Sequence, residues 1–179
     1  MFRLTFHSLL PGAIFFHALV TVVLSAGVNR SIDDALGDSV TGKKPTFLPS
    51  TPGVWENQTV CPGCALLPPT TSAFDGTYTA ATYHPDLKNI SVSFDFTGTA
   101  VYIFFILANN PPNPTITATT AANFTLDSSL VGSLSHFPDN LEFPAFQFNE
   151  SALAFSTTGL ENGAHQMIIS TTDLLRVSG

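Results

Sequence analysis

Apolar and polar residues alternate along residues 90–96, which makes this segment the clearest structural signal in the chain. One parity is apolar and the other is polar: Ile90, Val92, Phe94 and Phe96 against Ser91, Ser93 and Asp95. Because successive side chains of a β-strand point to opposite faces, the pattern predicts a strand with one face in the core and one in water. Thr97 and Gly98 then predict a turn. Residues 100–108 predict a second strand, which is apolar on both parities and therefore lies centrally in a sheet.

Two later regions predict further antiparallel pairs. Phe124 and Leu126 alternate with polar residues, and residues 127–129 predict a turn into a strand over 130–134. Residues 151–155 and 165–170 predict a hairpin around the loop TTGLENGA. Turns at intervals of about ten residues are typical of a β-sandwich, and no segment beyond the leader has a sustained helical period. The sequence therefore predicts an all-β, antiparallel sandwich.

The first 27 residues have the pattern of a secretory signal peptide. Arg3 precedes an apolar helical run, and small residues end it: Ser25, Ala26 and Gly27. The alternative is an uncleaved signal anchor, because Leu9 to Val28 is long enough to span a bilayer as a helix. We favour cleavage, since a proline, a glycine and a histidine interrupt the run.

Five Asn-X-Ser/Thr triplets follow the leader, whereas chance would give about two in this composition. Their acceptors are Asn29, Asn57, Asn89, Asn123 and Asn149. Leader and triplets together predict a glycoprotein that is secreted or lies at the extracellular face of the plasma membrane. We expect residues 28–73 to form a turn-rich segment with short strands and residues 74–179 to form the sandwich core.

Charged residues are scarce and mainly acidic. They make up 11% of the chain, with a formal net charge of −7 at pH 7, and Lys43-Lys44 is the only basic pair. Binding to nucleic acid or to an anionic membrane surface needs clustered basic residues, so the composition argues against both. No cofactor motif is present.

Cys61 and Cys64 form a CxxC with proline and glycine between them. In an exported chain the pattern favours a local disulfide, worth about 2 kcal/mol by loop-closure entropy. A redox pair and a metal site are the alternatives, although zinc would need two further ligands.

The acidic cluster of Asp33, Asp34 and Asp38 is a weak calcium candidate, and turns or caps are the alternative.

Aromatic and acidic residues near turns are weak candidates for sugar binding, because flat rings stack on sugars and carboxylates accept hydrogen bonds from hydroxyls. They are Trp55, Asp75, Tyr78 and Tyr83. The alternatives are packing for the rings and an Asp-Gly turn for Asp75.

Catalytic groups are not singled out. The histidines beyond the leader are His84, His136 and His165, and no nucleophile motif accompanies them. A hydrolase would require a carboxylate pair within reach, such as Asp75 with Asp95 or Asp139. We therefore predict no catalytic residues.

Several segments, taken in order, carry a family resemblance. They are SIDDALGDSVTG, WENQTVCPGCAL, AFDGTYTAATYHP, ISVSFDFTGTAVYIFFILAN, FTLDSSLVGSLSHFPD and GLENGAHQMIIST. The chain resembles an uncharacterised group of secreted or membrane-anchored glycoproteins of mushroom-forming fungi. The resemblance implies a jelly-roll domain similar to galactose-binding-like domains, and it supplies no catalytic residues.

This resemblance also implies a further aromatic strand, a membrane helix and a cytoplasmic tail. The chain departs from it after MIIST, where TDLLRVSG follows; either the last strand is missing or residues 174–177 form a shorter one. Membrane contact is then expected only through a retained leader or a helix beyond this chain. The leading functional prediction is a non-enzymatic extracellular module that binds cell-wall or surface glycans. The alternatives are a structural or adhesive surface protein without a small ligand and a polysaccharide hydrolase.

Overall fold

The computed structural model describes residues 27–171, except for positions 60, 62–63, 82, 112, 114, 117 and 139–143. Residues 1–26 of the predicted leader, the last eight residues and Asp139 lie outside this described part. Within it, no helix is of the length and apolar character that a membrane span requires.

The described chain consists of β-strands and short 3-10 turns, with no α-helix. The strands are β1 (Ile32–Asp33), β2 (Gly37–Asp38), β3 (Thr46–Leu48), β4 (Trp55–Asn57), β5 (Thr79–Ala81), β6 (Ile90–Phe104), β7 (Leu107–Ala108), β8 (Thr120–Leu126), β9 (Ser129–His136), β10 (Phe146–Gln147) and β11 (Leu153–Thr171). The 3-10 turns are η1 (Thr70–Ser72), η2 (Phe74–Gly76), η3 (Pro85–Leu87) and η4 (Asn149–Ala152). All pairings are antiparallel. The predicted all-β, antiparallel class is therefore confirmed.

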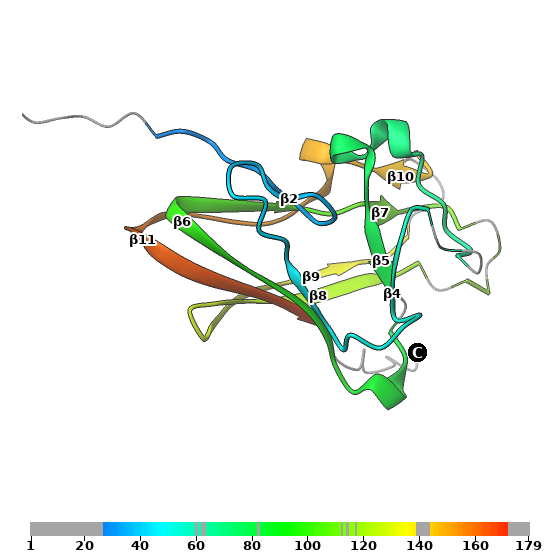
Figure 1. The fold of residues 1–179 in the computed structure, drawn as a ribbon. Helices are drawn as coiled ribbons and strands as arrows, with labels where there is room; N and C mark the ends of the chain where they lie inside the picture. Colours follow the sequence, from blue (N-terminus) through cyan, green and yellow to red (C-terminus); the bar gives the residue numbers. More distant parts are fainter. Residues whose placement is uncertain are drawn as a thin grey trace, which may run out of the picture.

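The main element is a five-stranded sheet in the order β3-β6-β11-β8-β9. Its two longest strands, β6 and β11, run side by side across the molecule (Figure 1). One row of paired residues on the core side crosses all five strands: Phe47, Val92, Ile169, Phe124 and Gly132. The next row faces outward: Leu48, Ser91, Ser170, Asn123 and Ser133. The alternation predicted from the sequence thus sets the two faces of the sheet.

Both predicted interruptions of the long strands are wrong. Thr97 and Gly98 do not turn the chain, because β6 continues from Ile90 to Phe104. Likewise, TTGLENGA is not a hairpin loop but an irregular part of β11, where the register with β6 shifts between Thr158 and Gly163. The glycines allow β6 and β11 to bend while they remain paired. The residues that predicted a turn therefore form a β-bulge.

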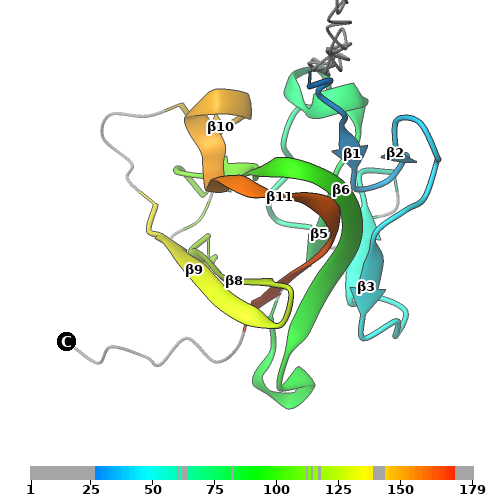
Figure 2. The ribbon, with the colours of Figure 1, turned by 90° about the vertical axis from the view of Figure 1, so that its left-hand side faces the viewer.

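The bend folds the sheet over itself, as its strong curvature in Figure 2 shows. Phe155 and Ile169 are fourteen residues apart on β11, a separation of about 45 Å in a straight strand. Nevertheless, the ring of Phe155 stacks on that of Phe124, the partner of Ile169, with 4.9 Å between centroids and 18° between planes. The core therefore lies between two halves of one curved sheet.

The second half of β6 is not covered on both sides, contrary to prediction. Tyr102 is 56% exposed and Phe104 is 48% exposed, whereas Ile103 between them is buried. No described strand forms a second layer on that outward face. Apolar residues on both faces of this strand thus did not predict burial of both faces.

Three two-stranded ribbons complete the fold: β1-β2, β4-β5 and β7-β10. The last is fastened by Asn109, which is fully buried. Its backbone N–H and its Nδ2 donate to the carbonyls of Ala145 and Pro144, at 2.9 and 3.1 Å. Gln147 Nε2 donates to Asn109 Oδ1 at 3.4 Å, so both ends of the buried amide are satisfied.

Candidate functional site

A small polar depression lies on the outward face, where the segment before β3 meets β6 and β11. Its volume is about 110 Å³. The lining residues are Ile32, Lys43, Lys44, Thr46, Ser93, Phe94, Asp95 and Gln166. Hydroxyl, amide, ammonium and carboxylate groups thus converge here beside the apolar side chain of Ile32, whereas the Phe94 side chain packs against the core. We call this depression the polar cleft.

Asp95 organises the polar cleft. Its Oδ2 is 2.6 Å from Lys43 Nζ, and its Oδ1 accepts from Gln166 Nε2 at 3.3 Å. These hydrogen bonds, from Lys43 first and then Gln166, lower the pKa of Asp95, so it is ionised at neutral pH. Because Lys43 and Asp95 are both well exposed, the pair adds little stability. Its consequence is positional, since it brings the side chains of Lys43, Asp95 and Gln166 together.

The loop that carries Lys43 is held by Asp38. Asp38 Oδ1 accepts from the backbone N–H groups of Thr41 and Val40, at 2.7 and 2.9 Å. It also pairs with Arg30 at 2.7 Å. The backbone bonds, and then Arg30, lower the pKa of Asp38 to about 2. In addition, the Asp38 N–H donates to the Lys43 carbonyl at 2.9 Å, which fastens the basic pair to the β1-β2 ribbon.

A second ionic group centres on His165, the residue before Gln166 in β11. His165 Nδ1 is 2.7 Å from Asp127 Oδ2, and its Nε2 is 2.9 Å from the Glu161 carbonyl oxygen. The hydrogen bond to Asp127, followed by that to Glu161, raises the pKa of His165. Asp127 responds in the opposite sense: the bond from His165 lowers its pKa. Since Asp127 occupies the turn between β8 and β9, the pair ties this turn to β11.

The three aspartates predicted as calcium candidates make separate sets of hydrogen bonds. Asp33 is buried and accepts from the backbone of Ala35 and Leu36 and from the Thr77 hydroxyl. Asp38 caps the loop already described. Within the described ranges, no three His, Cys, Asp or Glu residues are grouped to hold a metal ion. Asp33 and Asp38 therefore act as caps and turn residues in this structure, which gives the calcium hypothesis no support.

Asp34 is the one poorly satisfied member of this cluster. Its Oδ2 is buried without a hydrogen-bond partner in the described part of the chain. Burial raises the pKa of Asp34, and the neighbouring Asp33 charge adds to this effect, although hydrogen bonding with Thr79 opposes it. The ionised form of Asp34 is therefore a cost to the fold at neutral pH.

Asp34→Asn is expected to stabilise the protein at pH 7, by about 1 kcal/mol or less because the group is partly exposed. A raised carboxyl pKa destabilises the fold as pH rises through it, so the gain should vanish towards pH 3. Urea unfolding at pH 3 and pH 7 measures this difference. Asp33→Asn is the control: it weakens several hydrogen bonds and should destabilise at pH 7. Equal loss in both variants would contradict the assignment.

The predicted sugar-binding aromatics are not brought together. Trp55 packs on Phe47 at 5.0 Å, and its Nε1–H donates to the Leu48 carbonyl at 3.2 Å. Tyr78 is only 8% exposed. Trp55 pairs with Ala81 across the β4-β5 ribbon, so the parity of β5 puts Tyr78 towards the other face. These two rings thus do not form one stacking platform.

Tyr83 and Asp75 lie in turns. The Tyr83 hydroxyl donates to the Lys88 carbonyl at 3.0 Å, spanning the η3 turn. Asp75 is exposed within η2, with φ of 50°, and Gly76 follows with φ of 74°. The Asp-Gly pair therefore makes a turn, and neither residue lines the polar cleft.

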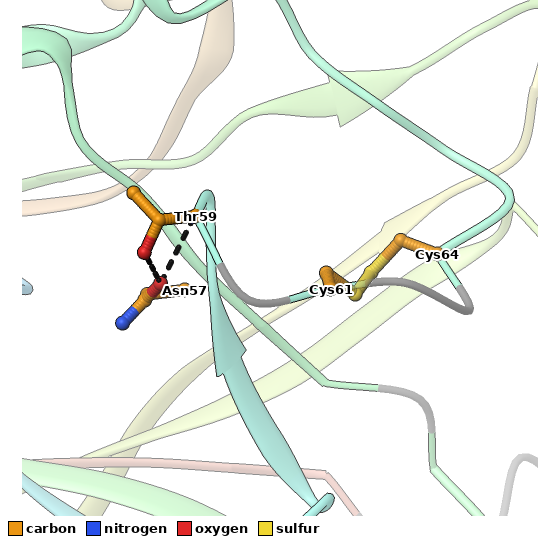
Figure 3. The surroundings of a disulfide bond; sticks show 4 residues. All are labelled: Asn57, Thr59, Cys61 and Cys64. Atoms are coloured by element: carbon orange, nitrogen blue, oxygen red, sulfur yellow. Dashed lines mark hydrogen bonds between the residues drawn. A yellow bond between two sulfur atoms is a disulfide. The ribbon is translucent and has the colours of Figure 1, made fainter.

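Cys61 and Cys64 form a disulfide, as predicted (Figure 3). The Cys64 N–H donates to the Cys61 carbonyl at 3.2 Å, which closes the turn that the bond spans. Asn57 lies close by, and its Oδ1 accepts from the Thr59 N–H and hydroxyl at 2.9 and 2.7 Å. The Asn57 amide nitrogen points away from Thr59 in Figure 3.

The other predicted glycan acceptors lie at exposed or outward positions. Asn29, Asn89 and Asn149 are exposed, and Asn123 is half-buried on the outward face of β8. None of the five acceptors lines the polar cleft. Glycans at these positions would thus start from residues outside it.

The histidines and carboxylates do not converge on one catalytic group. His136 Nε2 is 3.2 Å from the Ala108 carbonyl oxygen, and His84 precedes η3 at an exposed position. Asp95 is the single carboxylate among the described residues that line the polar cleft. Asp75 lies elsewhere, and Asp139 lies outside the described residues.

None of the residues that line the polar cleft was predicted as a binding residue: Asp95 was named only for a possible hydrolase pair, and Lys43 and Lys44 only as a basic pair. The available signals were the isolated Lys43-Lys44 pair and the single charge of Asp95 in an otherwise uncharged strand. The pairing of β11 with β6 brings Gln166 opposite Asp95. That partnership spans 71 residues and has no local signature.

In comparisons with known proteins, no family model, no curated protein and no solved structure matches the chain.

Proposed function

We propose that the chain is a non-enzymatic, extracellular glycan-binding module whose binding site is the polar cleft. The fold proposed with it is the jelly-roll sandwich of galactose-binding-like domains, with the curved sheet providing the core. The leader pattern and the asparagine triplets support export and glycosylation. The ligand class is a cell-wall or cell-surface saccharide.

One observation carries the proposal, namely the polar groups that Asp95 gathers. Sugars are recognised by side chains that accept and donate hydrogen bonds to several hydroxyls at fixed positions, beside apolar surface for C–H groups. Asp95, Gln166 and Ser93 offer such groups, and Ile32 supplies apolar surface. Because Lys43 and Gln166 already hold Asp95, a sugar would meet an organised carboxylate.

Charge within the polar cleft refines the expected ligand. Two lysines against one aspartate give a formal charge of +1 in a chain of −7. Lys43 pairs with Asp95, and no ion pair is recorded for Lys44 in the described part of the chain. A neutral or weakly acidic sugar suits this arrangement better than a strongly basic one.

The test uses the glycosylated protein secreted from a eukaryotic host, titrated by calorimetry with laminarihexaose, chitohexaose, mannan and polygalacturonate. We expect binding to at least one of them. Asp95→Ala should weaken that binding about tenfold or more, since charge-assisted hydrogen bonds contribute roughly 1.5–3 kcal/mol. Lys88→Ala, which removes an exposed lysine outside the polar cleft, should leave it unchanged.

Absence of binding to all four saccharides would overturn the proposal. Equal loss of affinity in the Asp95 and Lys88 variants would move the site elsewhere. Release of reducing sugar ends during incubation would contradict the non-enzymatic assignment and favour the hydrolase.

An adhesive role is the second candidate, favoured by the outward face at the end of β6. Phe104 pairs with Leu153, which is 44% exposed, and Tyr102 lies two residues away. These exposed apolar side chains suit contact with another surface. Binding that survives Asp95→Ala but is lost on Tyr102→Ser with Phe104→Ser would favour adhesion.

A further inference from the structure

We propose that His165 is a positioning residue for the polar cleft: through Asp127 it fixes Gln166 and thereby Asp95, so that the protonation state of His165 controls ligand binding. This deepens the proposed function and rests on it for the ligand, whereas the coupling itself can be tested without any ligand.

The hydrogen bonds of His165 match a doubly protonated ring. Nδ1 faces the Asp127 carboxylate at 2.7 Å, and Nε2 faces the Glu161 carbonyl at 2.9 Å. Both partners are acceptors, so each ring nitrogen is satisfied only when it carries a proton. The side chain is only 10% exposed, which leaves little access for water to replace a lost bond. Loss of one proton would set a lone pair against an acceptor.

From His165 the network continues through Asp127 to Gln166. The other carboxylate oxygen, Asp127 Oδ1, accepts from the Gln166 backbone N–H at 2.9 Å. The Asp127 N–H donates to the Gln166 carbonyl at 3.0 Å. Asp127 thus grips the Gln166 backbone on both sides while it pairs with His165. A shift of this carboxylate would move the backbone from which the Gln166 side chain extends.

Gln166 then reaches the ligand site directly. Its Nε2 donates to Asp95 Oδ1 at 3.3 Å, and Asp95 Oδ2 pairs with Lys43. Five residues from two strands and two loops therefore form one hydrogen-bonded path: His165, Asp127, Gln166, Asp95 and Lys43. The Gln166–Asp95 bond is its longest link, which makes it the link most easily broken.

Every element packed against His165 offers it a group that favours the cation. The β8-β9 turn contributes the Asp127 carboxylate, β11 the Glu161 carbonyl, and β6 the Gly98 carbonyl and the Phe96 ring, 5.3 Å away between centroids. Asp127 is the titratable side chain recorded against the ring among the described residues. Beyond Gln166 lie the charges of the polar cleft: Asp95, Lys43 and Lys44.

The direction of the pH dependence follows from these contacts. Asp127 raises the pKa of His165 above its ordinary 6.5, so the cation persists at mildly acidic to neutral pH. Because His165 lowers the pKa of Asp127 below 3.8, the carboxylate stays charged over the same range. The linkage is therefore complete below pH 6.5 and is lost as pH rises through the folded pKa of His165.

The decisive experiment is an NMR titration of the isotopically labelled, secreted protein from pH 5.5 to pH 9, without ligand. The signals followed are the His165 ring carbons and the Gln166 side-chain amide. We expect the Gln166 amide to shift in a single step with the midpoint of His165. A Gln166 signal that stays constant while His165 titrates would overturn the proposal.

Variants separate coupling from a merely structural role. His165→Gln keeps a donor towards Asp127 but cannot titrate, so the Gln166 step should disappear. Should that variant fold poorly, Asp127→Asn serves instead: it should lower the His165 midpoint and move the Gln166 step with it. His136→Gln is the matched control, because His136 contacts the Ala108 carbonyl and should leave the Gln166 profile unchanged. Loss of the step in the control would contradict the assignment to His165.

A binding arm with laminarihexaose and chitohexaose then tests the consequence for the ligand. Affinity should fall about threefold or more between pH 6 and pH 9 in the wild type and stay constant in His165→Gln. Binding with the same pH profile in both proteins would overturn control by His165 while the proposed function stands. If neither saccharide binds, the claim that His165 controls their binding is contradicted. The NMR titration still decides whether His165 and Gln166 are coupled.

Discussion

Phe124→Ala is expected to lower the free energy of unfolding by about 3–5 kcal/mol. Phe124 is fully buried at the centre of the core cluster, next to Met167 and Ile169. Its ring stacks on Phe155, so alanine leaves a cavity and also removes the contact that holds the two sheet halves together. Domains of this size are stable by about 5–15 kcal/mol, hence the loss is a large share. Chemical denaturation followed by near-ultraviolet circular dichroism measures it.

Leu130→Ala on the adjoining strand β9 is the control. Leu130 is 70% exposed and lies on the outward side, so truncation should change stability by less than about 0.5 kcal/mol. A similar loss in both variants would show that the hairpin is sensitive as a whole and that Phe124 is not the centre of the core. Gly132, opposite Phe124, is also informative: a Cβ there would lie 3.1 Å from the Phe155 ring. The position leaves room for the stack.

Gly37→Ala is expected to destabilise the protein by about 3 kcal/mol or more. Gly37 has φ of 91°, and an added Cβ would lie 2.8 Å from the carbonyl oxygens of both Gly42 and Lys43. These contacts are with backbone, which no side-chain rotation can relieve. Since the same loop presents Lys43 to Asp95, the variant should also lose saccharide binding. Denaturation and calorimetry provide the two measurements.

Gly42→Ala separates backbone conformation from collision. Gly42 also has a positive φ, 69°, but an added Cβ would meet nothing within 4 Å. The expected cost is only about 1 kcal/mol, from the left-handed conformation alone. If both substitutions lower the free energy of unfolding equally, the close approach at Gly37 does not contribute to the effect.

Local sequence signals predicted the strands well where one face is wet. The alternation from Ile90 to Phe96 and that from Asn123 to Leu126 appear in β6 and β8 with the expected sides packed on the core. The turn at Asp127 and Ser128 was also predicted; both residues have positive φ, 47° and 69°, as a two-residue hairpin turn requires. These features depend on neighbours in sequence, so sequence alone could supply them.

The candidate site was predicted less well. Trp55 and Tyr78 looked suitable for stacking sugars, yet Trp55 packs on Phe47 and Tyr78 is buried. Asp95, in contrast, gained its importance from Lys43 and Gln166, which lie 52 and 71 residues away along the chain. Residue type indicates what a side chain can bind, but its neighbours decide whether it is free to do so.

By itself, the sequence determined the antiparallel β class, the wet and dry sides of the strands around Phe94 and Phe124, and the Cys61–Cys64 disulfide. Only the tertiary structure decided that the glycines at 98 and 163 bend two paired strands instead of reversing them, since both outcomes satisfy the same backbone preferences. The choice depends on which strand supplies the hydrogen-bond partners. That pairing of β6 with β11 folded the sheet over Phe124 and placed Gln166 beside Asp95, because contacts between distant segments are set by register and curvature.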